Sequence, residues 1–349
     1  MKRITHYGIT DLAYCGFLLV GFHAEARAGR IDLEVVGDLP DDLRAAAGGD
    51  ENMPMISMFE ASDGGERVRF CVDNHDKSDF VHPELVRLVD FYFKGNHNPE
   101  EVAALDLDPA LRAKVRPLGA PFAPIQVPWR IHRPPLREVP ETGWDRRSMV
   151  RRARQLRRLP TVDFLRSLRS SEKTHDVSFV IRLYRQQHHS PINDFRNEVG
   201  RLLLASPDID ARVRFISASS SVWRKMKPTA AQPREHLARL ATSRLGIYVW
   251  GAHQCLSFKL FEQLAIGLPV IGQSIPQDRA NLAGLKGFDE QFRYDEPAAL
   301  VDAAAAAVND PSWLTARAES NAAVFDEFLA PEVVAGSLID VVFGADRPI

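Results

Sequence analysis

The stretch from Gly251 to Gly272, GAHQCLSFKLFEQLAIGLPVIG, decides the fold. The apolar run LGIYVW (245–250) precedes it and predicts a buried strand. Ser257 is a good helix N-cap, and the apolar spacing after it predicts a helix over 258–266. A second strand is predicted at 268–271, directly after the helix. Strand, loop, helix and strand in this order form a βαβ unit, which predicts an α/β fold.

The same alternation of element types extends in both directions from this unit. Short strands are predicted at 3–7, 31–36, 67–72, 90–94, 177–184 and 212–217. Helices are predicted at 11–27, 83–88, 193–205 (with Asn193 or Asp194 as N-cap), 234–243 and 298–308. Strands that alternate with helices predict parallel sheets covered on both faces.

The length of 349 residues exceeds that of one typical domain. A proline-rich stretch at 121–144 interrupts the alternation and predicts an extended connection. We therefore expect two Rossmann-like, doubly wound domains that face each other across a cleft. The expected boundaries are 1–125 for the first domain, 126–170 for a connection rich in Pro and Arg, 171–330 for the second domain and 331–349 for a helical tail.

The composition excludes several classes of protein. With 44 Lys and Arg against 46 Asp and Glu, the net charge is −2, so the chain has no global basic field and nucleic acid is not an expected partner. The cysteines, Cys15, Cys71 and Cys255, lie far apart, which disfavours a zinc site and favours a reducing compartment. The most apolar early stretch, 12–22, is too short to span a bilayer. A cytoplasmic protein is expected.

One segment departs from this neutral balance. Residues 145–158 contain seven arginines, with Met149, Ala153 and Leu156 at helical spacing. This pattern predicts a basic amphipathic helix. Its simpler interpretation is a solvated helix between the domains, and its functional interpretation is peripheral contact with an anionic membrane surface or a lipid-linked acceptor on the inner face of the membrane.

The helix predicted after Ser257 carries the chemistry. Its N-terminus points out of the carboxyl end of the sheet, where open α/β sheets bind ligands. Free N–H groups and the helix dipole favour an anion such as phosphate there. Lys259 adds a cation in the first turn, and the Glu262 carboxylate can accept two hydrogen bonds from a vicinal diol such as ribose.

This segment resembles the donor-binding segment of glycosyltransferases with two Rossmann domains, the GT-B fold. Many retaining members carry Glu, seven residues, a second Glu, and then Ala-x-Gly-x-Pro-Val-Ile. The matching residues are Glu262, Ala265, Gly267, Pro269, Val270 and Ile271, whereas Gln254 replaces the first Glu. The segment is also similar to the Ser/Thr-x-Lys-Leu and Gly-x-Pro-Val pattern of fucosyltransferase-like and exostosin-like inverting members, through Ser257, Lys259, Leu260, Gly267, Pro269 and Val270.

The resemblance covers roughly residues 176–330, since 292–300 and 309–311 also look like the C-terminal section of the family. It implies transfer of a sugar from a nucleotide-sugar donor, with UDP or GDP as the expected nucleotide. The acceptor would be a hydroxyl of a glycan, a lipid-linked or a small molecule. Gln254 puts the retaining mechanism in doubt and leaves the stereochemical class open. The alternatives are a sugar-nucleotide epimerase of the same fold and a non-catalytic two-domain protein that binds sugars or nucleotides.

Candidate donor-binding residues lie at the ends of strands in the second domain. The resemblance implies a basic residue against the donor diphosphate near the end of the first strand, because guanidinium groups present donors to phosphate in a fork. Lys225 and Lys227 follow the next strand. The full donor-binding set expected is Arg182, Arg185, Arg196, Lys225, Gln254, Ser257, Lys259 and Glu262.

An inverting transfer also requires a base that deprotonates the acceptor hydroxyl. The loops after two strands of the first domain supply the candidates Asp11, Asp73, His75 and Asp76. A carboxylate beside a histidine sets its tautomer and basicity, although both Asp73 and Asp76 also suit turns. No metal site and no cofactor are expected, because the Asp-x-Asp segments at 106–108 and 208–210 are explained best by chance.

Overall fold

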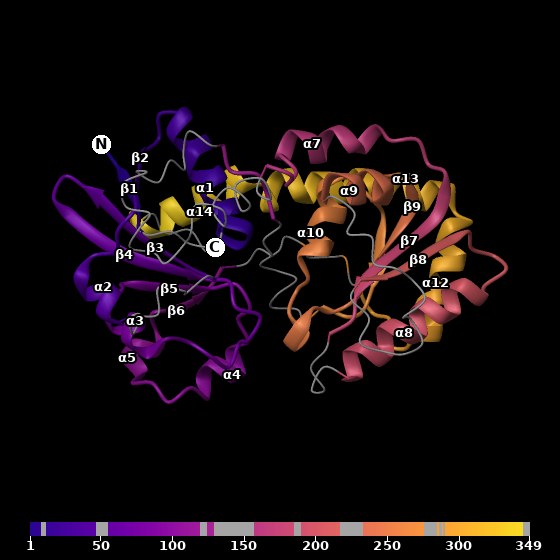
Figure 1. Ribbon diagram of the computed structural model, residues 1–349, viewed down its shortest axis with the longest axis horizontal. Coiled ribbons are helices and arrows are strands. Elements are labelled where there is room, and N and C mark those ends of the chain that lie inside the picture. Colours follow the sequence, from indigo (N-terminus) through magenta and orange to yellow (C-terminus); the bar gives the residue numbers. More distant parts are fainter. Residues whose placement is uncertain are drawn as a thin grey trace, which may run out of the picture. The chain divides into compact units, whose positions relative to one another are not determined.

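The computed structural model describes residues 1–7, 12–46, 55–118, 124–128, 157–184, 190–216, 233–275, 285, 288 and 290–344. They form two compact units: unit 1 comprises residues 1–161 and 328–349, and unit 2 comprises residues 162–327 (Figure 1). Each unit holds one β-sheet with helices, so the predicted α/β fold is confirmed. The placement of two domains across a cleft stays a prediction.

Unit 1 contains a six-stranded sheet in the order β2-β1-β3-β4-β5-β6. Its strands are β1 (Arg3–Tyr7), β2 (Asp32–Val36), β3 (Ile56–Asp63), β4 (Glu66–Asp73), β5 (Phe91–Lys94) and β6 (Val115–Pro117). The expectation of a purely parallel sheet is wrong here, because β3 runs antiparallel to both β1 and β4. All the other neighbours in this sheet pair in parallel.

A tight turn explains the antiparallel strand. Gly64 and Gly65 join β3 to β4 with φ angles of 62° and 125°, which only glycine adopts at low cost. The β3 sequence ISMFEASD is buried over its first six residues, so it lacks the polar alternation of a half-exposed strand. Because β3 is antiparallel, the carboxyl ends of β1, β2, β4, β5 and β6 still meet at one edge of the sheet.

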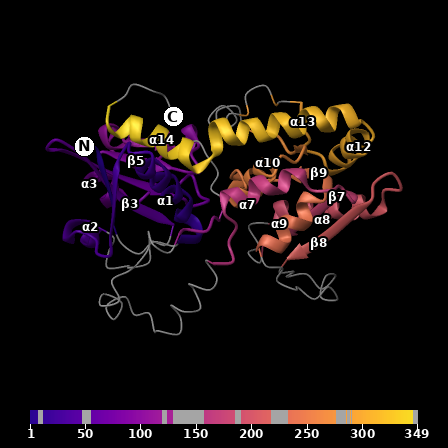
Figure 2. The ribbon, with the colours of Figure 1, turned by 90° about the horizontal axis from the view of Figure 1, so that it is seen from above.

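Helices complete unit 1. They are α1 (Leu12–Arg27), α2 (Asp41–Ala46), α3 (Pro83–Leu88), α4 (Pro99–Ala103), α5 (Pro109–Arg112) and α14 (Pro331–Val342). The last of these comes from the far end of the chain and packs along α1 (Figures 1 and 2). Seven residues of α14 are buried, so this packing adds a large apolar contact to unit 1.

Unit 2 contains a parallel four-stranded sheet in the order β10-β9-β7-β8. Its strands are β7 (His175–Arg182), β8 (Ala211–Ile216), β9 (Ser243–Tyr248) and β10 (Val270–Gly272). Its helices are α7 (Val162–Ser167), α8 (Ser190–Ala205), α9 (Pro233–Ala241), α10 (Phe258–Ala265), α12 (Pro297–Val308) and α13 (Pro311–Val324), with short 3-10 turns at Leu168–Ser170 and Ala252–Gln254 and a π-helical turn at Phe325–Leu329.

One helix start differs from the prediction. Helix α8 begins at Ser190, so Asn193 lies inside the helix and is not its N-cap. The Asn193 side chain instead accepts from Tyr184 N (2.9 Å) and donates to Tyr184 O (2.8 Å). It therefore fixes the chain just after β7, at the carboxyl end of the sheet.

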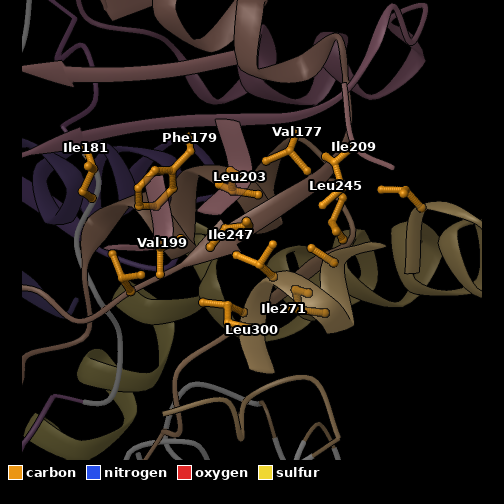
Figure 3. Packing of buried hydrophobic residues seen from close by; sticks show 14 of the residues in the cluster. Val177, Phe179, Ile181, Val199, Leu203, Ile209, Leu245, Ile247, Ile271 and Leu300 are labelled. Carbon is orange, nitrogen blue, oxygen red and sulfur yellow. The ribbon is translucent and has the colours of Figure 1, made fainter. Parts of the chain in front are cut away.

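Alternate residues of the strands in unit 2 form one core. Phe179 of β7 and Ile247 of β9 pack with Leu203 of α8 and Leu300 of α12 (Figure 3). The opposite face of the strands contacts α10, because a Cβ on Gly246 would lie 2.7 Å from Gln263 Oε1. The sheet is thus covered on both faces, as the alternation of strands and helices predicts.

The order of the strands defines a switch point between β7 and β9. The chain adds β8 on one side of β7 and then β9 and β10 on the other. Residues of β7 and β9 pair only at His175 with Ser243 and at Val177 with Leu245. The two strands therefore separate toward their carboxyl ends, where doubly wound sheets bind ligands.

Candidate active site

The helix start expected at Ser257 is confirmed. Ser257 is the N-cap of α10, and its side chain accepts from Lys259 N at 3.3 Å. The loop from β9 to this helix is closed by a hydrogen bond from Gly251 N to Cys255 O (2.9 Å). A Cβ at Gly251 would lie 2.4 Å from Cys255 Sγ, so only glycine fits this close approach.

The same loop holds two strained residues. His253 and Gln254 have φ angles of 51° and 56°, in the left-handed region that residues with a Cβ rarely adopt. Each such residue costs about 1 kcal/mol or more, and strain of this kind gathers at functional sites. Gln254 is exposed, so the residue that replaces the first Glu of the glycosyltransferase pattern lies at the surface of the loop.

Side chains of α10 occupy the gap between β7 and β9. Lys259 Nζ donates to Val180 O on β7, and Gln263 Nε2 donates to Ile247 O on β9 at 3.2 Å. These bonds satisfy carbonyls that the separated strands leave without partners in the sheet. A cavity of about 20 Å³ lies in the gap, lined by both side chains and by Glu262. It has room for about one water molecule, so a larger ligand would bind outside the strand ends.

Burial shifts both ionisable groups of α10. Burial lowers the pKa of Lys259, and the charges of Arg196 and Arg182 lower it further against the opposing effect of Glu262. Burial raises the pKa of Glu262, which is 7% exposed, and the Lys259 ammonium counteracts this rise. The cations of Lys259, Arg196 and Arg182 thus interact at the carboxyl end of the sheet, with the Glu262 carboxyl as the opposing charge nearest to Lys259.

Arg196 contributes to this charge from the interior. It is 2% exposed, and its guanidinium donates to Arg182 O (2.6 Å) and to Trp250 O. Its third donor, Nε, has no hydrogen-bond partner within the described chain. Burial lowers the pKa of Arg196. The sequence suggested an arginine that reaches a phosphate directly, whereas in the structure Arg196 bridges the last residue of β7 and the segment that follows β9.

Arg182 has the opposite placement. Its side chain is exposed at the last position of β7, and its own carbonyl is held by Arg196. This leaves the Arg182 guanidinium at the edge of the sheet where the donor is expected.

Sequence reasoning missed His236 on α9, for which no pattern in the sequence provides a signal. This side chain lines the same cavity, and burial together with Lys259, Arg214 and Arg239 lowers its pKa to about 4. His236 is therefore neutral at physiological pH. Three cations therefore lie close enough to His236 to disfavour its charged form, in addition to the larger effect of burial.

A second polar cluster lies in unit 1. Asp73, at the carboxyl end of β4, is fully buried and accepts from His75 Nδ1 at 2.6 Å. Lys94 and Tyr92 of β5 also donate to it, at 2.8 and 2.7 Å. The sequence placed Asp73 and His75 together but missed both partners on β5. A lysine at the end of the apolar strand FYFK was the available signal.

The other predicted site residues are Asp76 and several residues that the structure does not describe. Asp76 is exposed, and its backbone carbonyl accepts from Asn96. Asp11, Arg185, Lys225, Lys227 and most of the segment 145–158 lie outside the described residues, so their roles stay predictions. In the part of the chain that the structure describes, no helix is long and apolar enough to cross a membrane. Within the same part, no three His, Cys, Asp or Glu side chains are grouped as metal ligands.

Comparison with known proteins adds little to this geometry. No protein-family model and no curated protein matches the chain. A solved structure described as the glycotransferase of kitacinnamycin is similar at 13% identity and a TM-score of 0.33, over 95% of this chain and 74% of that chain. A likeness at this level carries no argument about function, so the functional conclusion rests on the site.

Proposed function

We propose that the chain is a glycosyltransferase whose unit 2 binds a nucleotide-sugar donor, with UDP or GDP as the nucleotide. The observation that supports this most is the proximity of three cations, Lys259, Arg196 and Arg182, at the switch point of a doubly wound sheet. Neighbouring cations repel one another, and a buried one such as Arg196 is costly without a counterion. A diphosphate at the N-terminus of α10 would supply that counterion in the position where such sheets bind ligands.

The ribose is the other polar part of the nucleotide, and we assign its recognition to Glu262. Its position on α10 places it one turn after Lys259, at the cavity between β7 and β9. Two ribose hydroxyls offer two donors, and a carboxylate accepts both. Burial raises the pKa of this carboxyl, so two hydroxyl donors would also stabilise its charged form.

The chemical step requires a leaving group that gains negative charge. As the bond between the sugar and the diphosphate breaks, cations fixed beside the phosphates stabilise the developing charge. We assign this role to Lys259 and Arg182, and Arg196 would support it by holding the Arg182 carbonyl. We infer that the transfer does not depend on a metal ion. Activity that EDTA abolishes and Mg²⁺ restores would contradict this inference.

Replacing Glu262 by Gln should weaken binding of the free nucleoside diphosphate by about 1–3 kcal/mol, the scale of a lost charged hydrogen bond. This corresponds to roughly a 5- to 150-fold rise in Kd. Titration calorimetry with UDP and GDP measures it, after thermal-shift screening selects the nucleotide.

Glu235→Gln is the matched control, since it removes an exposed carboxylate from the neighbouring helix α9. Its Kd should equal that of the wild type. Equal affinity in a folded Glu262→Gln variant would remove Glu262 from the nucleotide site.

Lys259→Met should lower kcat as well as affinity, because charge on the leaving group is greatest in the transition state. The wild-type affinity for the diphosphate should also fall as the pH rises through the lowered pKa of Lys259, since the ammonium is then lost. In Lys259→Met this pH dependence should be absent. Measurements of diphosphate affinity between about pH 7 and 10 compare the two proteins. An identical pH profile in both would exclude the Lys259 ammonium as the group that binds the diphosphate.

An epimerase of the same fold is the second candidate, since it would bind the same donor at the same place. The two activities differ in their need for an acceptor. Incubation of the selected nucleotide sugar alone should leave its stereochemistry unchanged, whereas an epimerase would convert it. Stable binding without any conversion, with every acceptor class offered, would favour the non-catalytic alternative.

A further inference from the structure

Polar side chains of three elements line the cavity between β7 and β9. Ser178 comes from β7, His236 from α9, and Lys259 and Glu262 from α10. Ser178 Oγ lies 2.5 Å from His175 Nε2 and so has a partner. The other three side chains bring an imidazole, an ammonium and a carboxylate to one small space, where polar groups need hydrogen bonds.

The hydrogen bonds of the described chain leave much of this polarity unused on α10. Lys259 Nζ donates to Val180 O, which takes one of its three donors. Among the described residues, Lys259 and Glu262 interact through their charges, without a hydrogen bond between them. The Glu262 carboxylate also accepts from no other residue in this part of the chain. A donor and an acceptor of opposite charge therefore face one cavity without direct contact.

His236 and Gln263 add further polar atoms. The pKa of His236, about 4, leaves its ring neutral at physiological pH, with one nitrogen that donates and one that accepts. Burial and neighbouring charges alone lower this pKa, since the ring has no hydrogen bond to a residue in the described ranges. Gln263 also lines the cavity, and its buried Oε1 has no hydrogen-bond partner within the same ranges.

The volume of the cavity suits a single water molecule. It is about 20 Å³, which exceeds the roughly 10–15 Å³ that one water needs and is far too small for a sugar or a phosphate. Buried waters typically make about three hydrogen bonds, to polar groups that otherwise have no partner. Donors on Lys259, acceptors on Glu262 and a neutral imidazole supply this number.

We propose that the cavity binds one water molecule, which accepts from Lys259 Nζ and donates to the Glu262 carboxylate, and that His236 positions this water through a ring nitrogen. The water gives the buried carboxylate a donor before any nucleotide arrives. It takes one of about four acceptor positions, so two remain for a pair of ribose hydroxyls. The water site itself is independent of the proposed function, whereas its effect on nucleotide binding rests on that function.

Titratable and charged groups surround this water on every neighbouring element. Those that act on Lys259 or His236, or line the cavity, come from α8, α9, β7, β8 and β9: Arg196, Arg239, Arg182, Arg214 and Tyr248. Burial favours the neutral form of Glu262, and the Lys259 ammonium favours the charged form. A hydrogen bond from the water adds to the second effect. Because His236 is neutral, replacing it leaves all these charges unchanged.

The first test detects the water and needs no nucleotide. Water-selective NOE spectra of the nucleotide-free chain should show a long-lived water beside the Lys259 side chain and the His236 ring. In His236→Leu, the ring nitrogens are lost and the signal at Lys259 should weaken or disappear. A wild type without such a water would overturn the proposal. An unchanged signal at Lys259 in His236→Leu would show that His236 does not position the water.

The second test measures the pKa of Glu262 by carbon-13 NMR of the glutamate carboxyl groups, with Glu262→Gln to assign the signal. His236→Leu should raise this pKa by about one pH unit, the effect of weakening a hydrogen bond to a charged group. His97→Leu makes the same substitution in unit 1 and should leave the pKa of Glu262 unchanged.

Two conservative variants separate hydrogen bonding from a change in packing. The amides of His236→Asn and His236→Gln reach about as far as Nδ1 and Nε2 of the ring, so one of the two variants should restore the pKa of Glu262. An unchanged pKa in His236→Leu would contradict the role of the water, and so would a shift that neither amide reverses.

Nucleotide binding is tested separately, with the nucleoside diphosphate that screening selects. At neutral pH, His236→Leu should raise its Kd about 3- to 10-fold, because a smaller fraction of Glu262 is ionised. The difference should narrow as the pH rises. If the water is present and no nucleotide binds, the proposed function fails and the water site stands. If both proteins bind the nucleotide equally at every pH, the inferred effect of the water on nucleotide binding is wrong.

Discussion

Replacing Lys94 by Met is expected to lower the free energy of unfolding of unit 1 by about 3–5 kcal/mol at pH 7, the usual cost of removing one partner from a buried ion pair. Lys94 Nζ and Asp73 Oδ2 are 2.8 Å apart, and neither side chain has exposed surface. Without the ammonium, the carboxylate is left in the interior with hydrogen bonds from Tyr92 and His75 alone. Hydrogen exchange of the β4 and β5 amides in increasing guanidinium measures the change in the unit concerned.

Two variants test the cause of this loss. Arg87→Met breaks an ion pair with Glu84 in which both side chains are more than half exposed, and it should cost less than about 1 kcal/mol. Adding Asp73→Asn to Lys94→Met removes the stranded charge and should recover most of the stability. An equally large loss of stability in Arg87→Met and Lys94→Met would contradict the buried ion pair as the cause. So would a double variant that is no more stable than Lys94→Met.

The pH dependence gives the sign of the effect. The pKa of Asp73 is about 2 in the folded protein against an ordinary 3.8, so its contribution to stability is complete above about pH 4 and is lost as the pH falls toward 2. In Lys94→Met the Asp73 pKa is higher, and the folded protein binds this proton at a higher pH. The difference in stability between the two proteins should therefore narrow as the pH falls.

The elements with a local signal in the sequence could be predicted, and those whose partners lie far away could not. The stretch from Ser257 to Gly272 contains its own cap, helix stop and strand, and the structure has each of them. Strand β3 was missed because its buried run lacks alternation and its partners are β1 and β4 on both sides. The Asp-Gly-Gly turn at 63–65 was a readable hairpin signal.

The candidate site shows the same division. Proximity along the chain was enough to predict that Asp73 would orient His75, and the 2.6 Å contact confirms that the two side chains meet. Proximity gave no information on burial, and so a fully enclosed Asp73 appeared among the possible bases. The burial of Arg196 was missed for the same reason, since an arginine is usually exposed, whereas here its guanidinium donates to carbonyls of two other segments and lies inside.

Replacing Gly21 by Val should destabilise unit 1 by about 3 kcal/mol, at the upper end of the range for overpacking. A Cβ at this position would lie 2.1 Å from Pro331 O and 2.7 Å from Ala335 Cβ. Both atoms belong to α14, and a backbone carbonyl cannot move aside as the end of a flexible side chain can. Helix α14 must shift away from α1 as a whole, so its amides should exchange faster than those of the sheet.

Gly336→Ala is the control, because it adds a Cβ, the first of the three carbon atoms that valine adds at Gly21, to a buried glycine of the helix that Gly21 contacts. Its nearest neighbours are the ends of the Arg30 side chain, at 3.4 Å and beyond, which can adjust. Alanine also favours a helix over glycine by up to about 1 kcal/mol, so this variant should be as stable as the wild type or more stable. A loss of stability in Gly21→Val together with no loss in Gly336→Ala would show that α14 is held by close backbone contact at Gly21. In the sequence alone, this glycine only interrupts an apolar run. Equal losses of stability in both variants would contradict this packing. So would hydrogen-exchange protection of the α14 amides that Gly21→Val leaves unchanged.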